Sequence, residues 1–277
     1  MECQIKDLSV HYEVFGDGHS IVILNGAGPD HRCMSGPLEP VFEKRKSWKR
    51  FYLDLPGTGK TKAKEWITSS DQILDIVLGF IESVIPGQHF ALVGSSYGAY
   101  LARGVVYRKP ALVDGLLIIC PAVIADRKKR TLPQHVALVR DAKFMDRLEP
   151  SQRELFESFA VVQTKRTWER TRDEVITGLD IADKDFFSRL QSHGYAFSFD
   201  VDDISSPFDK PTLILVGHQD AMVGYSDAWG IVENFPRATF AVLDRAGHNL
   251  PIEQEALFTV LVSEWLDRVE EDLARAA

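Results

Sequence analysis

Hydrophobic and polar residues follow two different patterns along the chain. Near the N-terminus, residues 3–7 and 9–16 alternate between polar and apolar side chains, which predicts strands with one exposed face. Several later segments are continuously apolar, which is typical of strands buried on both faces of a parallel sheet. These segments are 20-SIVILNGAG-28, 49-KRFYLDLPG-57, 89-HFALVG-94, 113-VDGLLIICP-121, 212-TLILVG-217 and 238-ATFAVLD-244.

Amphipathic segments lie between these apolar segments. In residues 69–85 the apolar side chains recur at helical spacing, and Ser70 is expected to cap the start of the helix. Further helices are predicted over residues 97–110, near residues 225–235, and over residues 252–273. Strands that alternate with helices predict an α/β fold with a doubly wound, mostly parallel sheet.

The alternation is interrupted between residues 122 and 209. This stretch shows no strong strand, and its charged, amphipathic segments at 152–162 and 183–195 predict short helices. We therefore expect a core domain made of residues 1–121 and 210–277, with residues 122–209 inserted as a helical lid.

Composition and charge narrow the class of protein. The 277 residues, 45% of them hydrophobic, suffice for one large core with an insertion. A net charge of −8 argues against a nucleic-acid or anionic-membrane binder, because both partners require a positive surface. No apolar segment approaches the roughly 20 residues of a membrane helix, and the N-terminus lacks the apolar core of a signal peptide. A cytoplasmic protein is expected.

Motifs for metals and cofactors are absent or incomplete. The three cysteines (Cys3, Cys33 and Cys120) form no C-x-x-C pair, which favours a reducing compartment and argues against a structural zinc site. Residues 57–61, GTGKT, resemble the end of a phosphate-binding P-loop. However, Asp54 stands where the motif requires its first glycine, and Pro56 removes one backbone N–H. We interpret Lys60 as a solvated loop residue, and we expect neither a cofactor nor a metal.

The strongest chemical signal is 94-GSSYG-98, which fits G-x-S-x-G between a predicted strand and a predicted helix. A nucleophilic serine has to project from a tight turn, so the flanking Gly94 and Gly98 leave room for the neighbouring elements. Ser96 is the candidate nucleophile. The backbone N–H of Tyr97, at the helix N-terminus, is a candidate donor to a developing oxyanion.

A serine nucleophile requires a base and an acid that orients the base. His248 lies in 246-AGHNL-250, a glycine-containing loop after the last predicted strand, and Asp220 lies in a turn after the strand 212–217. Two rival acids are weaker candidates, because Asp126 lies in a basic run and Asp244 is expected to lie on its strand. Six other histidines have no motif around them: His11, His19, His31, His89, His135 and His193.

The second oxyanion donor is expected in the loop after the first long strand. This loop reads 24-LNGAGPD-30, in which Gly26 and Gly28 allow the backbone to approach a ligand. The N–H of Ala27 is therefore the candidate donor.

These motifs together resemble the α/β-hydrolase fold superfamily in its lidded, esterase-like branch. The resemblance covers nearly the whole chain apart from the lid, and it rests on 25-NGAG-28, 54-DLPGTG-59, 94-GSSYG-98 and the pair 217-GHQD-220 with 246-AGH-248. It implies Ser96, Asp220 and His248 as the catalytic triad and Ala27 and Tyr97 as the oxyanion hole. It also implies that residues 54–59 shape a loop beside the active-site entrance.

The chain departs from the family pattern at the oxyanion loop, where Asn25-Gly26 replaces the usual His-Gly. Because asparagine also forms hydrogen bonds, we expect this loop to keep its shape. Ser96 excludes the branches that use aspartate or cysteine as the nucleophile.

The expected function is hydrolysis of a small carboxylic ester or related acyl compound through an acyl-enzyme. The alternatives are a carbon–carbon bond hydrolase, a lyase or a thioesterase with the same triad, and a non-catalytic binding protein. Many lid aromatics suggest a substrate with an apolar part, although most of them are expected to hold the lid helices together. They are Phe144, Phe156, Phe159, Trp168, Phe186, Phe187, Tyr195, Phe197 and Phe199.

Overall fold

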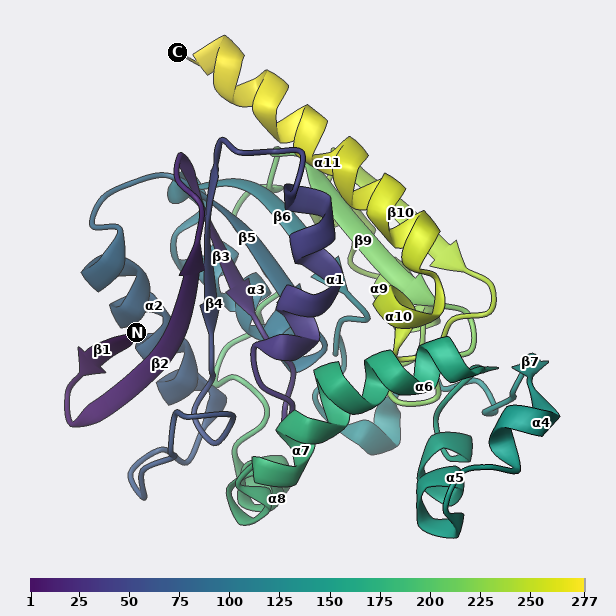
Figure 1. The fold of residues 1–277 in the computed structure, drawn as a ribbon. Helices are drawn as coiled ribbons and strands as arrows, with labels where there is room; N and C mark the ends of the chain where they lie inside the picture. Colours follow the sequence, from purple (N-terminus) through teal and green to yellow (C-terminus); the bar gives the residue numbers. More distant parts are fainter. Residues whose placement is uncertain (277) are drawn as a thin grey trace.

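An eight-stranded, mostly parallel sheet runs through the centre of the computed structural model, which describes residues 1–276 (Figure 1). The strand order is β1-β2-β4-β3-β5-β6-β9-β10. Only β1 with β2 and β2 with β4 pair antiparallel. The strands are β1 Glu2–Ile5, β2 Leu8–Phe15, β3 His19–Leu24, β4 Trp48–Leu53, β5 Phe90–Ser95, β6 Val113–Ile119, β9 Thr212–Gly217 and β10 Ala238–Leu243. The predicted fold class is confirmed.

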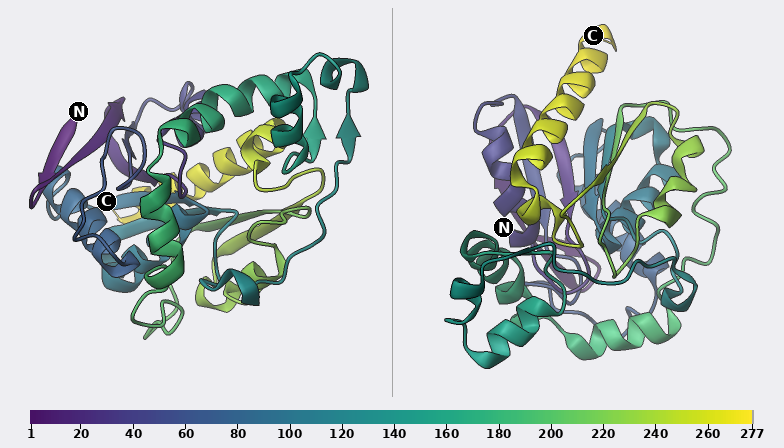
Figure 2. Two further views of the ribbon diagram at one scale, coloured as in Figure 1. Left: turned by 90° about the horizontal axis from the view of Figure 1, so that it is seen from below. Right: turned by 90° about the vertical axis from the view of Figure 1, so that its right-hand side faces the viewer.

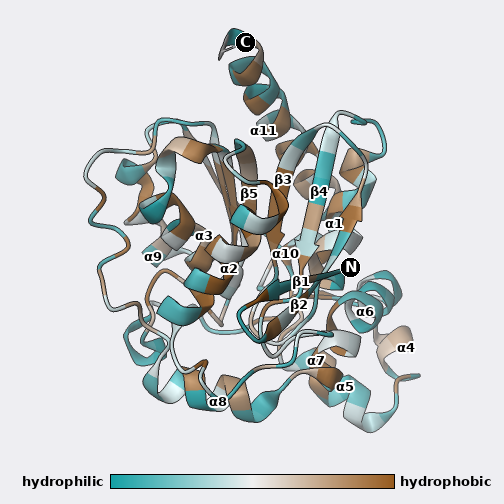
Figure 3. Cartoon of the chain, turned by 90° about the vertical axis from the view of Figure 1, so that its left-hand side faces the viewer, coloured by the Kyte–Doolittle hydropathy of each residue, from teal (hydrophilic) through white to brown (hydrophobic). Residues whose placement is uncertain are grey.

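Helices cover both faces of the sheet. Helix α1, Arg32–Phe42, packs beside α11, Glu255–Ala276, on one face, whereas α2, Ser70–Val84, packs beside α3, Tyr97–Arg108, on the other (Figure 2). The central strands β6 and β9 are buried along their whole length, as their continuous apolar sequences predicted. The colouring in Figure 3 shows a similar apolar concentration in β3 and β5.

Helix α1 has no counterpart in the sequence-based prediction. Pro37 and Pro40 lie inside it, and proline normally disfavours a helix interior because it lacks an N–H and its ring crowds the preceding turn. Buried Leu38 and Phe42 show that packing against the sheet outweighs this local cost.

The helix predicted over residues 69–85 is confirmed, but its cap is Ser69 rather than Ser70. The Ser69 hydroxyl accepts the Gln72 N–H, and the Gln72 side chain accepts the Ser69 N–H, which is a complete capping box. Ser70 is buried instead, and its hydroxyl donates to the Tyr195 carbonyl. The prediction chose the wrong one of two adjacent serines because only the backbone conformation distinguishes them.

Towards the C-terminus, each of the two predicted helices is divided into two elements. The segment near 225–235 forms α9, Ser226–Trp229, and a 3-10 turn, Val232–Asn234. The predicted helix over 252–273 is divided into α10, Leu250–Glu253, and α11. Among residues 1–276, no helix is both long enough and apolar enough to cross a membrane.

Residues 122–209 run beneath the edge of the sheet where the parallel strands end (Figures 1 and 2). A small cluster of buried residues, which includes Phe156 and Trp168, packs inside this segment apart from the main core. The helices of residues 122–209 are α4 Ala142–Met145, α5 Pro150–Glu157, α6 Lys165–Thr171, α7 Thr177–Ile181 and α8 Lys184–His193. The same segment has a π-helical turn at Arg172–Ile176 and two short strands, β7 Val139–Arg140 and β8 Val162–Gln163.

The turn between β5 and α3 brings three pieces of backbone unusually close together. A Cβ atom placed on Gly94 would lie 2.4 Å from the Gly98 carbonyl oxygen, and one placed on Gly98 would lie 2.4 Å from the carbonyl oxygens of Leu24 and Asn25. All of these neighbours are backbone atoms, so a side chain there could be accommodated only if a strand or the helix moved.

We therefore predict that Gly98→Ala lowers the free energy of unfolding by about 3 kcal/mol through overpacking. The matched control is Gly87→Ala, because Gly87 has a φ of +64° but nothing within 4 Å of its added Cβ. The control should lose only about 1 kcal/mol from backbone strain. Urea denaturation of both variants measures the difference, and an equal or smaller loss for Gly98→Ala would contradict the packing argument.

Candidate active site

Ser96 occupies the sharp turn between β5 and α3. Its φ of +55° and ψ of −113° are unfavourable for a residue with a side chain. Two hydrogen bonds hold this backbone in place: the Ser96 N–H donates to the Ile119 carbonyl at 2.9 Å, and the Ser96 carbonyl accepts the Ala122 N–H at 3.2 Å. The end of β6 thus holds the strained turn that the G-x-S-x-G motif predicted.

The structure brings the three candidate catalytic side chains together. His248 Nε2 lies 3.0 Å from Ser96 Oγ, and His248 Nδ1 lies 2.8 Å from Asp220 Oδ2. Asp220 follows β9, His248 follows β10, and Ser96 follows β5, so all three lie where parallel strands end at the same edge of the sheet.

Asp220 is fully buried and is stabilised as a carboxylate. Its Oδ1 accepts the N–H groups of Met222 at 2.8 Å and Val223 at 3.1 Å. Burial is the largest influence and raises the pKa of Asp220, but His248 and the two N–H groups outweigh it and lower the pKa below its ordinary value. An ionised Asp220 only accepts hydrogen bonds, so the facing Nδ1 of His248 carries the proton.

The interaction between Asp220 and His248 shifts the pKa of His248 in the opposite direction, upwards. Burial is again the largest influence and lowers its pKa, but the charge and hydrogen bond of Asp220 outweigh burial, so the pKa lies above the ordinary value of 6.5. With Nδ1 protonated, neutral His248 presents the lone pair of Nε2 to the Ser96 hydroxyl. This arrangement is suited to general-base catalysis.

The two candidate oxyanion donors come from the start of α3 and from the loop after β3. Tyr97 is the first residue of α3, so its N–H has no acceptor within the helix. Ala27 is exposed in the loop after β3, and a Cβ placed on the preceding Gly26 would lie only 3.5 Å from Ser96 Cβ. The oxyanion roles of Ala27 and Tyr97 remain predictions.

Asn25 forms hydrogen bonds at the position where the family usually has histidine. Its side chain is fully buried; Oδ1 accepts the Leu55 N–H at 3.2 Å, and Nδ2 donates to the Pro29 carbonyl at 2.6 Å and to Thr58 Oγ1 at 3.1 Å. One amide therefore joins both ends of the oxyanion loop to the loop after β4.

The loop that resembles a P-loop is folded around a carboxylate. Asp54 Oδ2 accepts the Lys60 N–H at 2.9 Å, and Gly59, with a φ of +51°, lies so close that an added Cβ would be 2.1 Å from that oxygen. Lys60 itself is exposed, as predicted. The buried carboxylate of Asp54 therefore lies where a phosphate-binding loop would bind its anion.

The rival acids have other partners. Asp126 caps a 3-10 turn by accepting the Lys128 N–H. Asp244 lies one residue beyond β10 rather than on the strand, and it accepts a hydrogen bond from the Gln219 side chain at 3.0 Å.

Sequence reasoning missed Glu253, a buried acid on α10. Its carboxylate accepts the Gly247 N–H at 2.7 Å, the Val161 N–H at 2.7 Å and the Val162 N–H at 3.3 Å. Burial, which outweighs these hydrogen bonds, raises its pKa. Glu253 thus joins the inserted segment to the loop that carries His248. No motif identifies such a residue, because all its partners are backbone groups and two of them are about 90 residues away in the sequence.

Helix α7 of the inserted segment packs directly on the oxyanion loop. A Cβ placed on Gly178 would lie 2.6 Å from the Asp30 nitrogen, and one placed on Gly28 would lie 2.7 Å from a methyl carbon of Leu179. Glycine at both positions allows this close approach.

The aromatic residues noted in the inserted segment were expected mostly to hold its helices together, but only part of them do. Four form the small cluster inside the segment, whereas Phe186, Phe187, Tyr195, Phe197 and Phe199 pack with the main core. Phe156 packs edge-on against Phe159 and Trp168. Phe197 stacks on Tyr100 of α3 with ring centroids 4.3 Å apart. These rings hold the helices in place.

Comparisons with known proteins identify the family. The family model described as "Alpha/beta hydrolase family" matches residues 21–260. A pyrrolizixenacetamide deacetylase of Xenorhabdus hominickii is 26% identical, covering 95% of this chain and 96% of that protein. A pimeloyl-[acyl-carrier protein] methyl ester esterase of Legionella pneumophila (strain Corby) is 22% identical, covering 94% and 100%.

A solved structure of an alpha/beta superfamily hydrolase from Oenococcus oeni PSU-1 superimposes with a TM-score of 0.88 at 28% identity, covering 98% of this chain and 99% of that one. The family match spans most of the sequence, and the structural match spans nearly all of it. The chain belongs to the alpha/beta hydrolase family, and it is a hydrolase.

Proposed function

We propose that the chain is a serine hydrolase that cleaves a small carboxylic ester or a related acyl compound through an acyl-enzyme. The observation that carries this proposal is the continuous chain of contacts from Ser96 Oγ to His248 Nε2, 3.0 Å, and from His248 Nδ1 to Asp220 Oδ2, 2.8 Å. These contacts match the distances over which a nucleophile, its base and an orienting acid exchange or share protons.

In the first half of the reaction, Ser96 Oγ attacks the acyl carbonyl carbon while its proton passes to His248 Nε2. The carbonyl oxygen becomes an oxyanion, for which Ala27 and Tyr97 would supply backbone N–H donors. His248 then gives the proton to the leaving alcohol as the bond to the acyl carbon breaks. Asp220 stabilises the transient imidazolium without taking its proton.

In the second half, His248 removes a proton from water, which attacks the acyl-enzyme carbonyl. The resulting intermediate collapses to the free acid, and Ser96 regains its proton from His248.

Residues 122–209 would act as the lid that selects the substrate. Support comes from the close packing of α7 on the oxyanion loop and from Glu253, which bonds both to this segment and to the His248 loop. This segment would cover the entrance to the active site, and a small substrate with an apolar part would fit there.

The names of the relatives are consistent with attack on a carbonyl carbon. They include a deacetylase, a methyl ester esterase and, at 24% identity, a putative carbamate hydrolase of Variovorax paradoxus. A 2-hydroxy-6-oxononadienedioate/2-hydroxy-6-oxononatrienedioate hydrolase of Pseudomonas putida is 21% identical. For this reason carbon–carbon bond hydrolysis stays the second candidate.

Replacing the nucleophile tests the mechanism. Ser96→Ala should lower kcat by roughly 10⁴-fold or more on a chromogenic short-chain ester, because the acyl-enzyme cannot form. It should also abolish labelling by a fluorophosphonate probe while leaving the circular dichroism spectrum unchanged. Ser95→Ala removes the adjacent hydroxyl and should remain labelled. Wild-type turnover by Ser96→Ala would refute the assignment.

The pH dependence of kcat/KM tests the state of His248. The imidazole must be neutral to accept the Ser96 proton, and its pKa lies above 6.5. Activity should therefore rise with increasing pH through a pKa above 6.5, and Asp220→Asn should move the imidazole titration, followed by NMR, to lower pH. An acidic limb centred below 6.5 in the wild type would contradict the proposed coupling.

A substrate panel distinguishes the reaction classes. We expect the largest kcat/KM for small carboxylic esters, with lower values for thioesters, lactones and β-diketones of similar size. A β-diketone that is cleaved faster than every ester would favour the carbon–carbon bond hydrolase. No turnover of any compound, together with no fluorophosphonate labelling, would favour a binding protein.

A further inference from the structure

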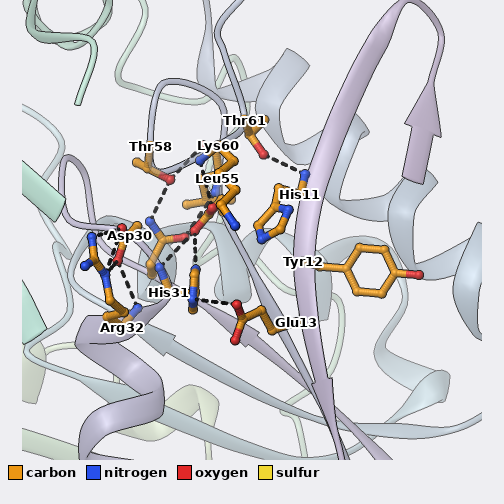
Figure 4. Close-up of polar contacts among 12 residues, drawn as sticks. His11, Tyr12, Glu13, Asp30, His31, Arg32, Leu55, Thr58, Lys60 and Thr61 are labelled. Atoms are coloured by element: carbon orange, nitrogen blue, oxygen red, sulfur yellow. Dashed lines mark hydrogen bonds and ion pairs between the residues drawn. The ribbon is translucent and has the colours of Figure 1, made fainter. Parts of the chain in front are cut away.

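A second cluster of buried polar side chains lies where β2, the start of α1 and the loop after β4 meet (Figure 4). His11 comes from β2, His31 directly precedes α1, and Asp54 begins the loop after β4. One ligand-type atom from each of the three residues lies within 4.8 Å of the other two, and all three residues are buried. The mechanism proposed above uses none of these side chains.

His31 is held between two carboxylates. Its Nδ1 lies 2.8 Å from Asp54 Oδ1, and its backbone N–H donates to the same oxygen at 3.0 Å. On the other side of the ring, Nε2 lies 3.4 Å from Glu13 Oε1. A carboxylate on the far ring nitrogen is the arrangement that orients many metal-bound histidines and raises their basicity.

His11 supplies the independent sign of a ligand site. It is only 8% exposed, and its Nε2 is buried with no hydrogen-bond partner among residues 1–276. Its ring lies 6.0 Å from the ring of His31, measured between centroids. A buried polar nitrogen without a partner is costly and requires an explanation, and a bound cation would supply one.

The charge around the cluster also suits a cation. The nearby Asp54 carboxylate would compensate part of the charge of a cation.

We propose that His11, His31 and Asp54 form a binding site for a divalent transition metal ion, with Zn²⁺ the best match. Two imidazoles and one carboxylate are a ligand set typical of Zn²⁺, which forms bonds of about 2.0–2.2 Å to such groups. Water would complete four ligands, and Glu13 would orient His31 through its far ring nitrogen. Binding releases the proton shared between His31 Nδ1 and Asp54 as both atoms turn to the metal.

The three ligands belong to three separate segments, which indicates what the metal would do. It would join β2, the end of the oxyanion loop and the loop after β4, where Asp54 already accepts the Lys60 N–H. The metal would therefore stabilise the fold behind the active site and would not take part in the reaction. The lack of paired cysteines argues only against a thiolate zinc site, and the histidine–carboxylate cluster is a different kind of site.

Residues 1–276 contain one rival set of ligand-type atoms. Cys120, Asp220 and His248 also lie within 4.8 Å of one another. A metal bound there would occupy the triad, would include a thiolate, and would inhibit the enzyme. The two sites therefore differ in spectrum and in their effect on activity.

Metal binding to the purified full chain tests the proposal. After dialysis against a chelator, the wild type should take up one equivalent of Zn²⁺ in competition with a chromophoric chelator. Its thermal midpoint should rise with Zn²⁺ and remain unchanged with Mg²⁺. Co²⁺ in place of Zn²⁺ should give visible bands of nitrogen and oxygen ligation, without a thiolate charge-transfer band.

Variants locate the ion. His11→Gln should weaken Zn²⁺ binding at least 100-fold, yet its midpoint without metal should stay near that of the wild type, because Nε2 forms no hydrogen bond that is lost. Glu13→Gln should weaken binding about 10-fold or more. His193→Gln, at an exposed histidine, is the matched control and should bind as the wild type does.

Three results would overturn the proposal: no Zn²⁺ uptake by the wild type, equal uptake by His11→Gln, or a thiolate band in the Co²⁺ spectrum. The Co²⁺ spectrum needs only the wild type, so it decides the matter even if a variant fails to fold. None of these results bears on the serine mechanism, which the fluorophosphonate labelling tests separately.

Discussion

Ser96 holds a backbone conformation that costs free energy, and the strands around it supply the contacts that keep it there. Its φ of +55° is anchored by hydrogen bonds to Ile119 and Ala122 at the end of β6. Gly94 and Gly98 allow β5, α3 and the end of β3 to meet without side chains between them. Since parallel strands end at one edge, the same packing carries the loops after β9 and β10 to the serine. The geometry of the site therefore follows from the geometry of the sheet.

The loops at this edge share a second feature, which is a buried polar side chain that binds backbone N–H groups. Asp54 does so in the loop after β4, Asp220 in the turn after β9, and Asn25 in the loop after β3. Loop backbone lacks the regular partners of helices and strands, and an unpaired buried N–H is costly. A carboxylate or amide supplies acceptors and fixes the loop. Asp54 is thus an acid with a structural role.

The sequence predicts those features of the structure that depend on residues close together in the chain. Continuous apolar runs identify the central strands, and the glycines around Ser96 identify the turn, because each signal lies within a few residues. Features that depend on distant partners are not predictable in this way. Packing keeps α1 helical despite Pro37, and Glu253 gains its role from backbone groups of the segments at 161–162 and 247.

Glu253 also explains how the inserted segment and the loop that carries His248 are connected. One of its oxygens accepts N–H groups at the start of β8, and the other accepts the Gly247 N–H beside His248. A displacement of the inserted segment that broke the contacts to Val161 and Val162 would leave this buried carboxylate with a single backbone donor. Its charged form would then be less stable, because burial already raises its pKa. The Glu253 carboxylate is therefore most stable when all three backbone donors are present, and this favours the arrangement in which the inserted segment and the His248 loop are held together.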